Sequence, residues 1–537
     1  MKMKSPSTAG RKGSCIGNYL KGLVIRHECF LGLLVLASGG MALILLATPL
    51  GCGISPDSIE YINGSRNLLS GNGYSTTYTG DVMPITNWPP GFSLTLAGLG
   101  LFGIDPVSGA RWLNAVLMGA NILMVGLVTR QATGGLGVPS ILAAFLCLTS
   151  ADILWAHSYA WSEPLFILLI LTGLFSLNVW LQRPRVGLLL ASGLAFGGAL
   201  ATRHIGLPML AGGLLALLAF DRQRWTARLR NGFFFGLMGV APAALFALRN
   251  QAVSGEPTNW HLTFHPMSPS NVAGIVKAVG AWVVPEPAGP FSLGHKVMLV
   301  CAAALVAFGA AWLLYRKIRA LQRGDASREG TAQAVCLVLI ASYTAFLIGA
   351  ICFLRLDIAV EIRRFLVPLH VLVLCIAVGF VFQEIGAWHR RKTFILVAFG
   401  LVILIASAIN AGSWLYRTRM DAQGYASRTW RTSEVIAWTS TLPPQVRLVS
   451  NQGLALNFLT GRPVRELPIA FDAADERPVR DWQSNLKLLA PELEDRGGFI
   501  IYFLQSRRIM PSLQALESAL PLVEAKRFPD AVILTLQ

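Results

Sequence analysis

Long apolar runs separated by short polar segments dominate the first 412 residues of this chain. A helix needs about 20 predominantly apolar residues to cross a bilayer, and eleven of the runs approach or reach that length. They are residues 29–50, 108–129, 137–154, 163–181, 186–201, 205–220, 232–248, 295–315, 332–353, 365–382 and 393–412. The pattern predicts a polytopic α-helical membrane protein with about eleven transmembrane helices in a domain of residues 29–412.

A further apolar run, residues 92–103, is too short to span and follows Trp88-Pro-Pro-Gly91. If it is a re-entrant or interfacial helix, the clusters of Lys and Arg all fall on one side of the membrane. Such clusters mark the cytoplasmic side, which places the basic tail of residues 1–28 inside. The clusters are that tail, Arg130, Arg183 with Arg185, and residues 222–230, 316–328 and 389–392.

The external face then carries a first loop of residues 51–107, a second loop of residues 249–294, and residues 413–537. The second loop is rich in Trp, His and Pro, which is typical of an ordered lid and not of a linker. Residues 413–537 lack long apolar runs and contain short strand-like and helix-like segments. They predict a small external α/β domain.

Composition supports this class. Only 14% of the 537 residues are charged, against about 25% in soluble proteins. The net charge of +17 follows from the one-sided basic clusters, so no nucleic-acid partner is expected. Most of the eight cysteines lie inside apolar runs without CxxC spacing, which predicts neither a metal site nor a disulfide framework.

Polar residues that suit chemistry begin directly after the first span, at Ser55-Pro-Asp-Ser-Ile-Glu-Tyr61. Asp57 and Glu60 are three residues apart and share one face of a helical turn. One interpretation is a helix start, with Ser55 or Asp57 as N-cap and Glu60 in the first turn. The other is a carboxylate pair at a reaction surface, which accounts better for Asp57.

Seven motifs follow one another along residues 29–370. They are Asp57 with Glu60-Tyr61, Gly71-Asn-Gly-Tyr74, Trp88-Pro-Pro-Gly91, Ala110-Arg-Trp-Leu-Asn114, Ser162-Glu-Pro-Leu-Phe166, Thr202-Arg203 and Arg364-Phe-Leu-Val-Pro368. Their order resembles the GT-C superfamily of polyprenyl-phosphate-sugar-dependent glycosyltransferases, most closely the bacterial branch of protein mannosyltransferases and the lipid A aminoarabinose transferase. The first loop departs from the aminoarabinose branch because it contains no lysine to hold the lipid phosphate.

The resemblance implies transfer of a sugar, with inversion, from a polyprenyl phosphate to a lipid, glycan or protein acceptor. It places the active site on the periplasmic face of a bacterial inner membrane. Asp57 corresponds to the acidic residue of the active site and Glu163 to a second acid at the start of a later helix. For Glu163 the plainer alternative is a carboxylate that stabilises a helix N-terminus.

Such a transfer needs a base for the acceptor proton, and Asp57 is the candidate. It also needs cations for the leaving phosphate. The candidates are Arg203 with His204 and Arg363 with Arg364, which are external against the positive-inside trend. Pairing with Asp357 and Glu361 is the alternative for one of these arginines.

Further candidate substrate contacts are Glu60, Tyr74 and Trp88. The aromatic residues near the external face either stack on sugar rings or anchor the chain at the membrane interface. They are Tyr74, Trp88, Trp155 and Trp161. No metal ligand is predicted, because the spacing of His157, His261 and His265 does not indicate a metal site. The resemblance to the superfamily keeps open a divalent ion that bridges Asp57 and the donor phosphate.

Two other classes remain open. A transporter or lipid flippase would carry charges within its helices, and the mid-span segments here are almost free of charge. A glycan ligase or polymerase would have similar topology but a pyrophosphate-linked donor.

Overall fold

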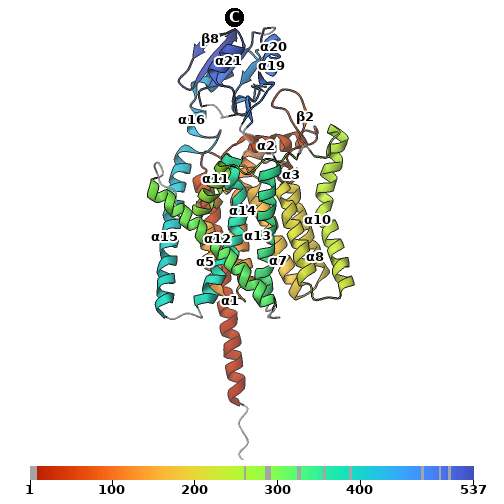
Figure 1. Ribbon diagram of the computed structural model, residues 1–537, viewed down its shortest axis with the longest axis vertical. Coiled ribbons are helices and arrows are strands. Elements are labelled where there is room, and N and C mark those ends of the chain that lie inside the picture. The colour runs from red at the N-terminus through yellow and green to blue at the C-terminus, as the bar shows by residue number, and fades with distance from the viewer. Residues whose placement is uncertain are drawn as a thin grey trace, which may run out of the picture.

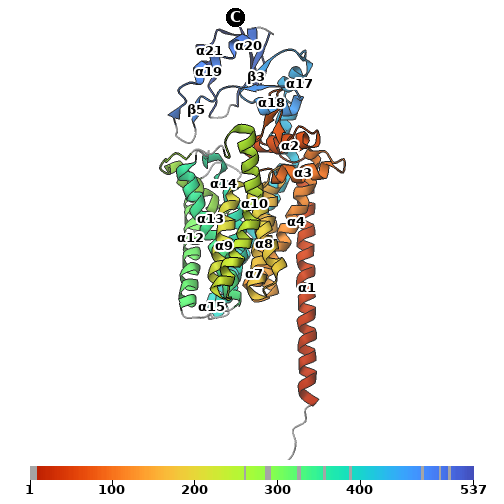
Figure 2. The ribbon, with the colours of Figure 1, turned by 90° about the vertical axis from the view of Figure 1, so that its right-hand side faces the viewer.

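Long helices occupy the apolar runs of the sequence, and a small sheet domain lies at one end of the helical bundle (Figures 1 and 2). This computed structural model describes residues 9–258, 262–284, 292–322, 328–354, 358–385, 390–472, 477–494, 497–505 and 509–537. The long helices are α1 (Ala9–Ala47), α4 (Pro106–Ala132), α7 (Glu163–Gln182), α8 (Val186–Thr202), α9 (Leu207–Phe220), α10 (Trp225–Ser254), α12 (Leu293–Gln322), α13 (Arg328–Phe353), α14 (Ile358–Ile385) and α15 (Arg390–Asp421).

In the described part of the chain, eight helices are long and apolar enough to cross a membrane. A ninth span results if α5 (Gly137–Thr149) and α6 (Ala151–Ser158), which meet at 57°, count as one. The segments α8 and His204–Phe220 are apolar but shorter. These elements match the eleven predicted runs one for one, while the number of spans stays a prediction. Helix α3 (Gly91–Gly100) has only ten residues, as expected for a segment that does not cross.

The polar first loop folds into α2 (Pro56–Leu69) and a hairpin of β1 (Ser75–Thr76) and β2 (Met83–Pro84). Ser55 is the N-cap of α2, because its side chain accepts from the backbone N–H of Ser58 while the Ser58 hydroxyl accepts from the backbone of Ser55. Of the two N-cap candidates, Ser55 therefore fills the role. The carboxylate of Asp57 is left for other contacts.

Helix α10 differs from expectation. The second loop was predicted to begin at residue 249, but the helix continues to Ser254 and ends at Gly255, whose φ is 76°. The polar residues Arg249 and Asn250 stay helical because their side chains donate to backbone carbonyls of the first loop at Ile85 and Thr86. Helix α11 (Pro269–Gly280) follows within the second loop. Trp260, His261 and the prolines at 285, 287 and 290 lie outside the described residues.

The C-terminal domain is α/β, as predicted. Its five-stranded sheet has the order β4-β3-β7-β9-β8, with β3 parallel to both β4 and β7, and β9 antiparallel to β7 and β8. The strands are β3 (Leu448–Ser450), β4 (Arg465–Glu466), β7 (Phe499–Phe503), β8 (Leu522–Arg527) and β9 (Ala531–Leu536). Ile500 and Ile501 point to opposite faces and both are fully buried, because helices cover both sides of the sheet.

This domain packs directly on the first loop. Residues Ile59 and Ile62 of α2 share a buried apolar cluster with Leu454 and Ala455 of α18 (Gly453–Thr460). The backbone N–H of Val464 donates to the carbonyl of Tyr78 at 3.2 Å. Helix α2 therefore lies between the membrane bundle and the C-terminal domain (Figure 2).

Candidate active site

The N-terminal ends of α2, α7 and α14 meet at the boundary between the bundle and the C-terminal domain. Each of these ends contributes an acidic or basic side chain to one cluster, and Arg364 of α14 joins the other two. Its Nη1 lies 2.8 Å from Asp57 Oδ2, and its Nε lies 2.8 Å from Glu163 Oε1. Arg203, which precedes the short helix η1 (His204–Gly206), adds a second contact to Glu163 Oε1 at 2.9 Å.

The two acidic side chains differ in their exposure to solvent. The Glu163 side chain is 0% exposed, whereas 22% of the Asp57 side chain is exposed. An unpaired buried charge is costly, and the two guanidinium groups offset that cost for Glu163. Asp57 is therefore the carboxylate that a second molecule can reach.

Arg203 also binds a hydroxyl group. Its Nη1 donates to Ser162 Oγ at 3.1 Å, and that hydroxyl lies 3.0 Å from the hydroxyl of Tyr61. Pro164 stands in the first turn of α7, where its missing N–H leaves no hydrogen bond unmade. Glu163 is accordingly both the first-turn acid of a helix and a partner of two arginines.

Arg363 does not join this cluster. Its Nε binds Asp152 of α6, and its guanidinium lies over the ring of Trp155 at 4.9 Å. The alternative partners weighed from the sequence, Asp357 and the side chain of Glu361, lie outside the described part of the chain.

Three further candidate residues contact the first loop and not the arginine cluster. They are Tyr74, Trp88 and His204. The Tyr74 hydroxyl donates to the carbonyl of Trp88 at 3.0 Å, and Arg249 donates to the carbonyl of Tyr74 at 2.6 Å. His204 Nε2 lies 3.0 Å from the carbonyl of Asn87. These contacts hold the loop in place, and a direct contact of the three with substrate stays a prediction.

Glu60 lies one turn after Asp57 on α2 and is only 6% exposed. The pKa of Glu60 is raised to about 7, first by burial and then by the charges of Asp57 and of Glu466 in the C-terminal domain. A hydrogen bond from Thr76 lowers this pKa in part. Glu60 therefore takes up a proton near neutral pH, and it faces the domain interface.

Two polar residues of this region escaped the sequence analysis. Asp152 lies inside a predicted apolar run, where an ionisable residue is a signal in itself. Arg249 is an arginine on the predicted external side, against the positive-inside trend, which is the same signal that identified Arg203. Its partners are backbone carbonyls of the first loop.

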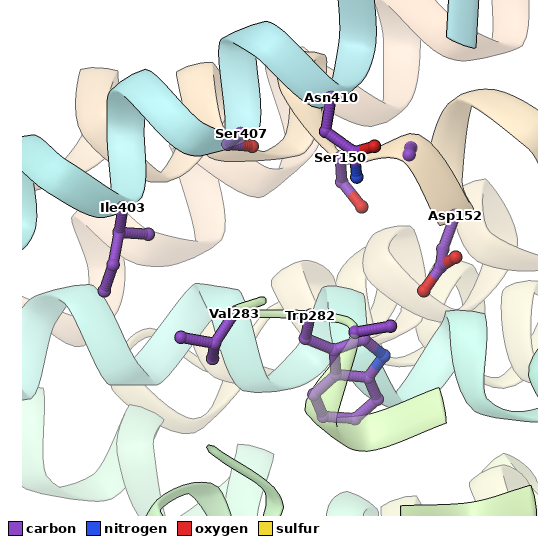
Figure 3. Close-up of a pocket in the computed structure, with 9 residues that line it drawn as sticks. Ser150, Asp152, Trp282, Val283, Ile403, Ser407 and Asn410 are labelled. Carbon is purple, nitrogen blue, oxygen red and sulfur yellow. The ribbon is translucent and has the colours of Figure 1, made fainter. Parts of the chain in front are cut away.

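A small hollow lies beside Asp152, at the break between α5 and α6 (Figure 3). Figure 3 shows Asp152 and Ser150 across from Trp282, with Asn410 of α15 nearby. The hollow is partly open and has about 320 Å³ of empty space, but its enclosed part holds only about one water molecule. It is too small for a sugar or a lipid headgroup.

Within the residues that the structure describes, no group of three or more His, Cys, Asp or Glu side chains could hold a metal ion. Asp57 and Glu163 each accept from Arg364 in this arrangement. A divalent ion beside Asp57 stays a hypothesis from the resemblance.

No model of a protein family matches the sequence, nor does any curated protein sequence. Solved structures match its fold. ArnT from Cupriavidus metallidurans, solved bound to undecaprenyl phosphate, aligns over 93% of this chain and 97% of its own, with 15% identity and a TM-score of 0.55. AglB, an oligosaccharyltransferase from Archaeoglobus fulgidus solved with an inhibitory peptide and a dolichol-phosphate, aligns over 88% of this chain and 69% of its own, with 12% identity and a TM-score of 0.54.

The arabinofuranosyltransferase AftD from Mycobacteria aligns over 94% of this chain and 40% of its own, with 14% identity and a TM-score of 0.53. All three are GT-C glycosyltransferases. This chain has the GT-C fold. The resemblance inferred from the order of the motifs is thereby confirmed for the fold. Within that fold, the first-loop acid Asp57 and the later acid Glu163 come together through Arg364.

Proposed function

We propose that this protein is a membrane-embedded glycosyltransferase that moves a sugar from a polyprenyl-phosphate donor to a lipid, glycan or protein acceptor. The observation that carries the proposal is the cluster of Asp57, Arg364, Glu163 and Arg203 at one end of the bundle, beneath the C-terminal domain. The GT-C fold supports it, since ArnT was solved with undecaprenyl phosphate and AglB with a dolichol-phosphate. We place this end at the periplasmic face of a bacterial inner membrane.

Asp57 is the proposed general base. A base must come within hydrogen-bond reach of the acceptor hydroxyl, and Asp57 is the more exposed of the two acids. The acceptor oxygen attacks the anomeric carbon from the side opposite the phosphate, Asp57 takes its proton, and the sugar–phosphate bond breaks. This single displacement inverts the anomeric configuration. Glu163 holds the arginines and takes no proton.

Arg203 and Arg364 are the proposed phosphate contacts. Guanidinium groups bind phosphate oxygens in pairs of hydrogen bonds. The formal charges of the two arginines and the two acids cancel, so a donor phosphate competes with a carboxylate for a guanidinium. When Arg364 turns from Asp57 to the phosphate, the Asp57 carboxylate becomes free to accept the acceptor proton. Donor binding and base activation are thus coupled through one side chain.

The test is transfer of label from a synthetic polyprenyl-phosphate sugar by the purified protein in lipid nanodiscs, with and without a chelator. We expect a labelled acceptor and free polyprenyl phosphate. A parallel reaction with a pyrophosphate-linked donor distinguishes a ligase or polymerase. Movement of intact donor between leaflets without bond cleavage would show a transporter and contradict the proposal.

A further inference from the structure

Two consecutive arginines of α14 each lie over a tryptophan of the same short segment. The guanidinium carbon of Arg363 is 4.9 Å from the ring centre of Trp155, and that of Arg364 is 3.9 Å from the ring centre of Trp161. The two tryptophan rings meet edge to face, with centres 4.7 Å apart. The two tryptophans therefore form one aromatic pair that contacts both arginines.

Trp161 is enclosed on both faces. Arg364 covers one face, and the ring of Tyr159 stacks on the other at 4.2 Å and 13°. Trp161 is only 3% exposed. A sugar ring cannot stack on it, which excludes one of the two roles considered for this residue from the sequence.

The edge of the same indole contacts the helix that carries Asp57. Trp161 Nε1 donates to Ser55 Oγ at 2.7 Å, and Ser55 is the N-cap of α2. Asp57 stands two residues after this cap and binds Arg364. One side chain thus fixes both ends of the Asp57–Arg364 ion pair, the guanidinium through its face and the helix start through its N–H group.

We propose that Trp161 is a positioning residue for the transfer reaction. Its effect on catalysis rests on the proposed function. Trp161 keeps Arg364 within reach of both Asp57 and the donor phosphate, so that the guanidinium can turn from one to the other. Attraction between a guanidinium and an indole face is strongest where water is excluded, as it is here. A leucine of comparable burial supplies neither the face nor the hydrogen bond, whereas a phenylalanine supplies the face alone.

The first experiment compares Trp161→Leu and Trp161→Phe with the wild type in the transfer assay. We expect kcat to fall at least tenfold in Trp161→Leu, with a smaller rise in KM for the donor because Arg364 is also a proposed phosphate contact, and Trp161→Phe to recover most of both losses. Trp180 of α7 is the control, because it is 2% exposed and, in the part of the chain that the structure describes, no arginine lies over it. Trp180→Leu should keep kcat near the wild-type value. Equal losses in the leucine variants at 161 and 180, or no rescue by phenylalanine, would overturn the positioning role.

A second measurement does not depend on activity. Thermal unfolding midpoints of Trp161→Leu, Arg364→Lys and the double variant report whether the two side chains act together. We expect the double variant to lose clearly less than the sum of the single shifts. If the wild type transfers no sugar but the shifts are not additive, the proposed function fails and the contact stands. Additive shifts would refute the inference whether or not the protein transfers sugar.

Discussion

Arg364 Nε lies 2.8 Å from Glu163 Oε1, across 201 positions of sequence. The contact joins the start of α14 to the start of α7 at a point where both side chains are almost completely buried. The same guanidinium also holds Asp57, so Arg364 links the buried acid to the partly exposed one. In the proposed reaction, Glu163 acts on Asp57 through Arg364 and Asp57 does the chemistry.

The role of Asp57 is tested by Asp57→Asn. The amide keeps the size of the side chain but cannot take a proton, so we expect transfer to fall by about a hundredfold or more. Binding of undecaprenyl phosphate, measured by calorimetry, should change far less.

Asp105→Asn is the matched control for Asp57. Asp105 lies in the same loop, is the N-cap of α4 and pairs with Arg66 at the surface. We expect near wild-type transfer, because Asn and Asp rank together as N-caps. Full activity in Asp57→Asn would remove this residue as the base.

The two arginines of the site should differ when they are replaced by alanine. Loss of either phosphate contact should weaken donor binding by about 1.5–3 kcal/mol. Arg364→Ala also leaves two acids without their shared partner, so we expect an additional loss of folding stability of about 3–5 kcal/mol. Arg203→Ala leaves Glu163 with Arg364 and should cost less. Donor titrations and thermal unfolding in detergent measure the two effects, and unchanged donor affinity in both variants would exclude them as phosphate contacts.

The raised pKa of Glu60 predicts how the stability of the protein depends on pH. Its pKa is raised to about 7 in the folded protein from 4.5, so the folded state binds more protons than the unfolded state between these values. Stability therefore falls as pH rises through this window, by roughly 3 kcal/mol for the full shift. Glu60→Gln should remove most of this decline. Unfolding midpoints from pH 5 to pH 8 decide the matter, and identical pH curves for variant and wild type would contradict the prediction.

The linker to the C-terminal domain crosses the first loop at Gly424. Its φ is 57°, and a Cβ added there would lie 2.0 Å from the carbonyl oxygen of Ile54, just before the α2 cap. We expect Gly424→Ala to displace the linker, destabilise the protein by about 1–3 kcal/mol and reduce transfer. Gly412→Ala is the control, because a Cβ there meets nothing within 4 Å. Equal behaviour of the two variants, measured by unfolding and transfer, would show that the crossing tolerates a side chain.

The orientation in the membrane is tested by labelling single cysteines. Helices α7, α9 and α14 begin at the site and run away from it, so the basic residues 183, 185 and 222–230 lie at the opposite end of the bundle. By the positive-inside rule we expect that end to be cytoplasmic. Cysteines in residues 60–80 and 430–530 should react with an impermeant reagent from outside, and cysteines in 222–230 only after permeabilisation. Labelling of 222–230 and 430–530 from the same side would refute the topology.

Local features of the sequence determined the class of this protein and the position of its loops. The length of an apolar run and the side of its flanking charges are properties of short segments, so the helices, the short α3 and the α/β domain could be predicted. Local pattern also allowed four site residues to be named, because each is a polar residue at the predicted external end of an apolar run: Asp57, Glu163, Arg203 and Arg364. The cap of α2 stayed open between Ser55 and Asp57 because the two residue types cap equally well.

Only the tertiary structure decided which charges meet. Arg363 and Arg364 are neighbours in sequence, yet one binds Asp152 and the other binds Glu163 and Asp57, which lies 307 positions away. The pairing depends on how three helix ends pack, and no local pattern encodes that packing. The same holds for α10, whose last turn extends beyond its apolar run because Arg249 finds carbonyl partners in a loop more than 160 positions earlier. The position of each helix follows from local hydrophobicity and its predicted membrane side from the flanking charges, whereas ion pairs between distant segments exist only once the bundle has formed.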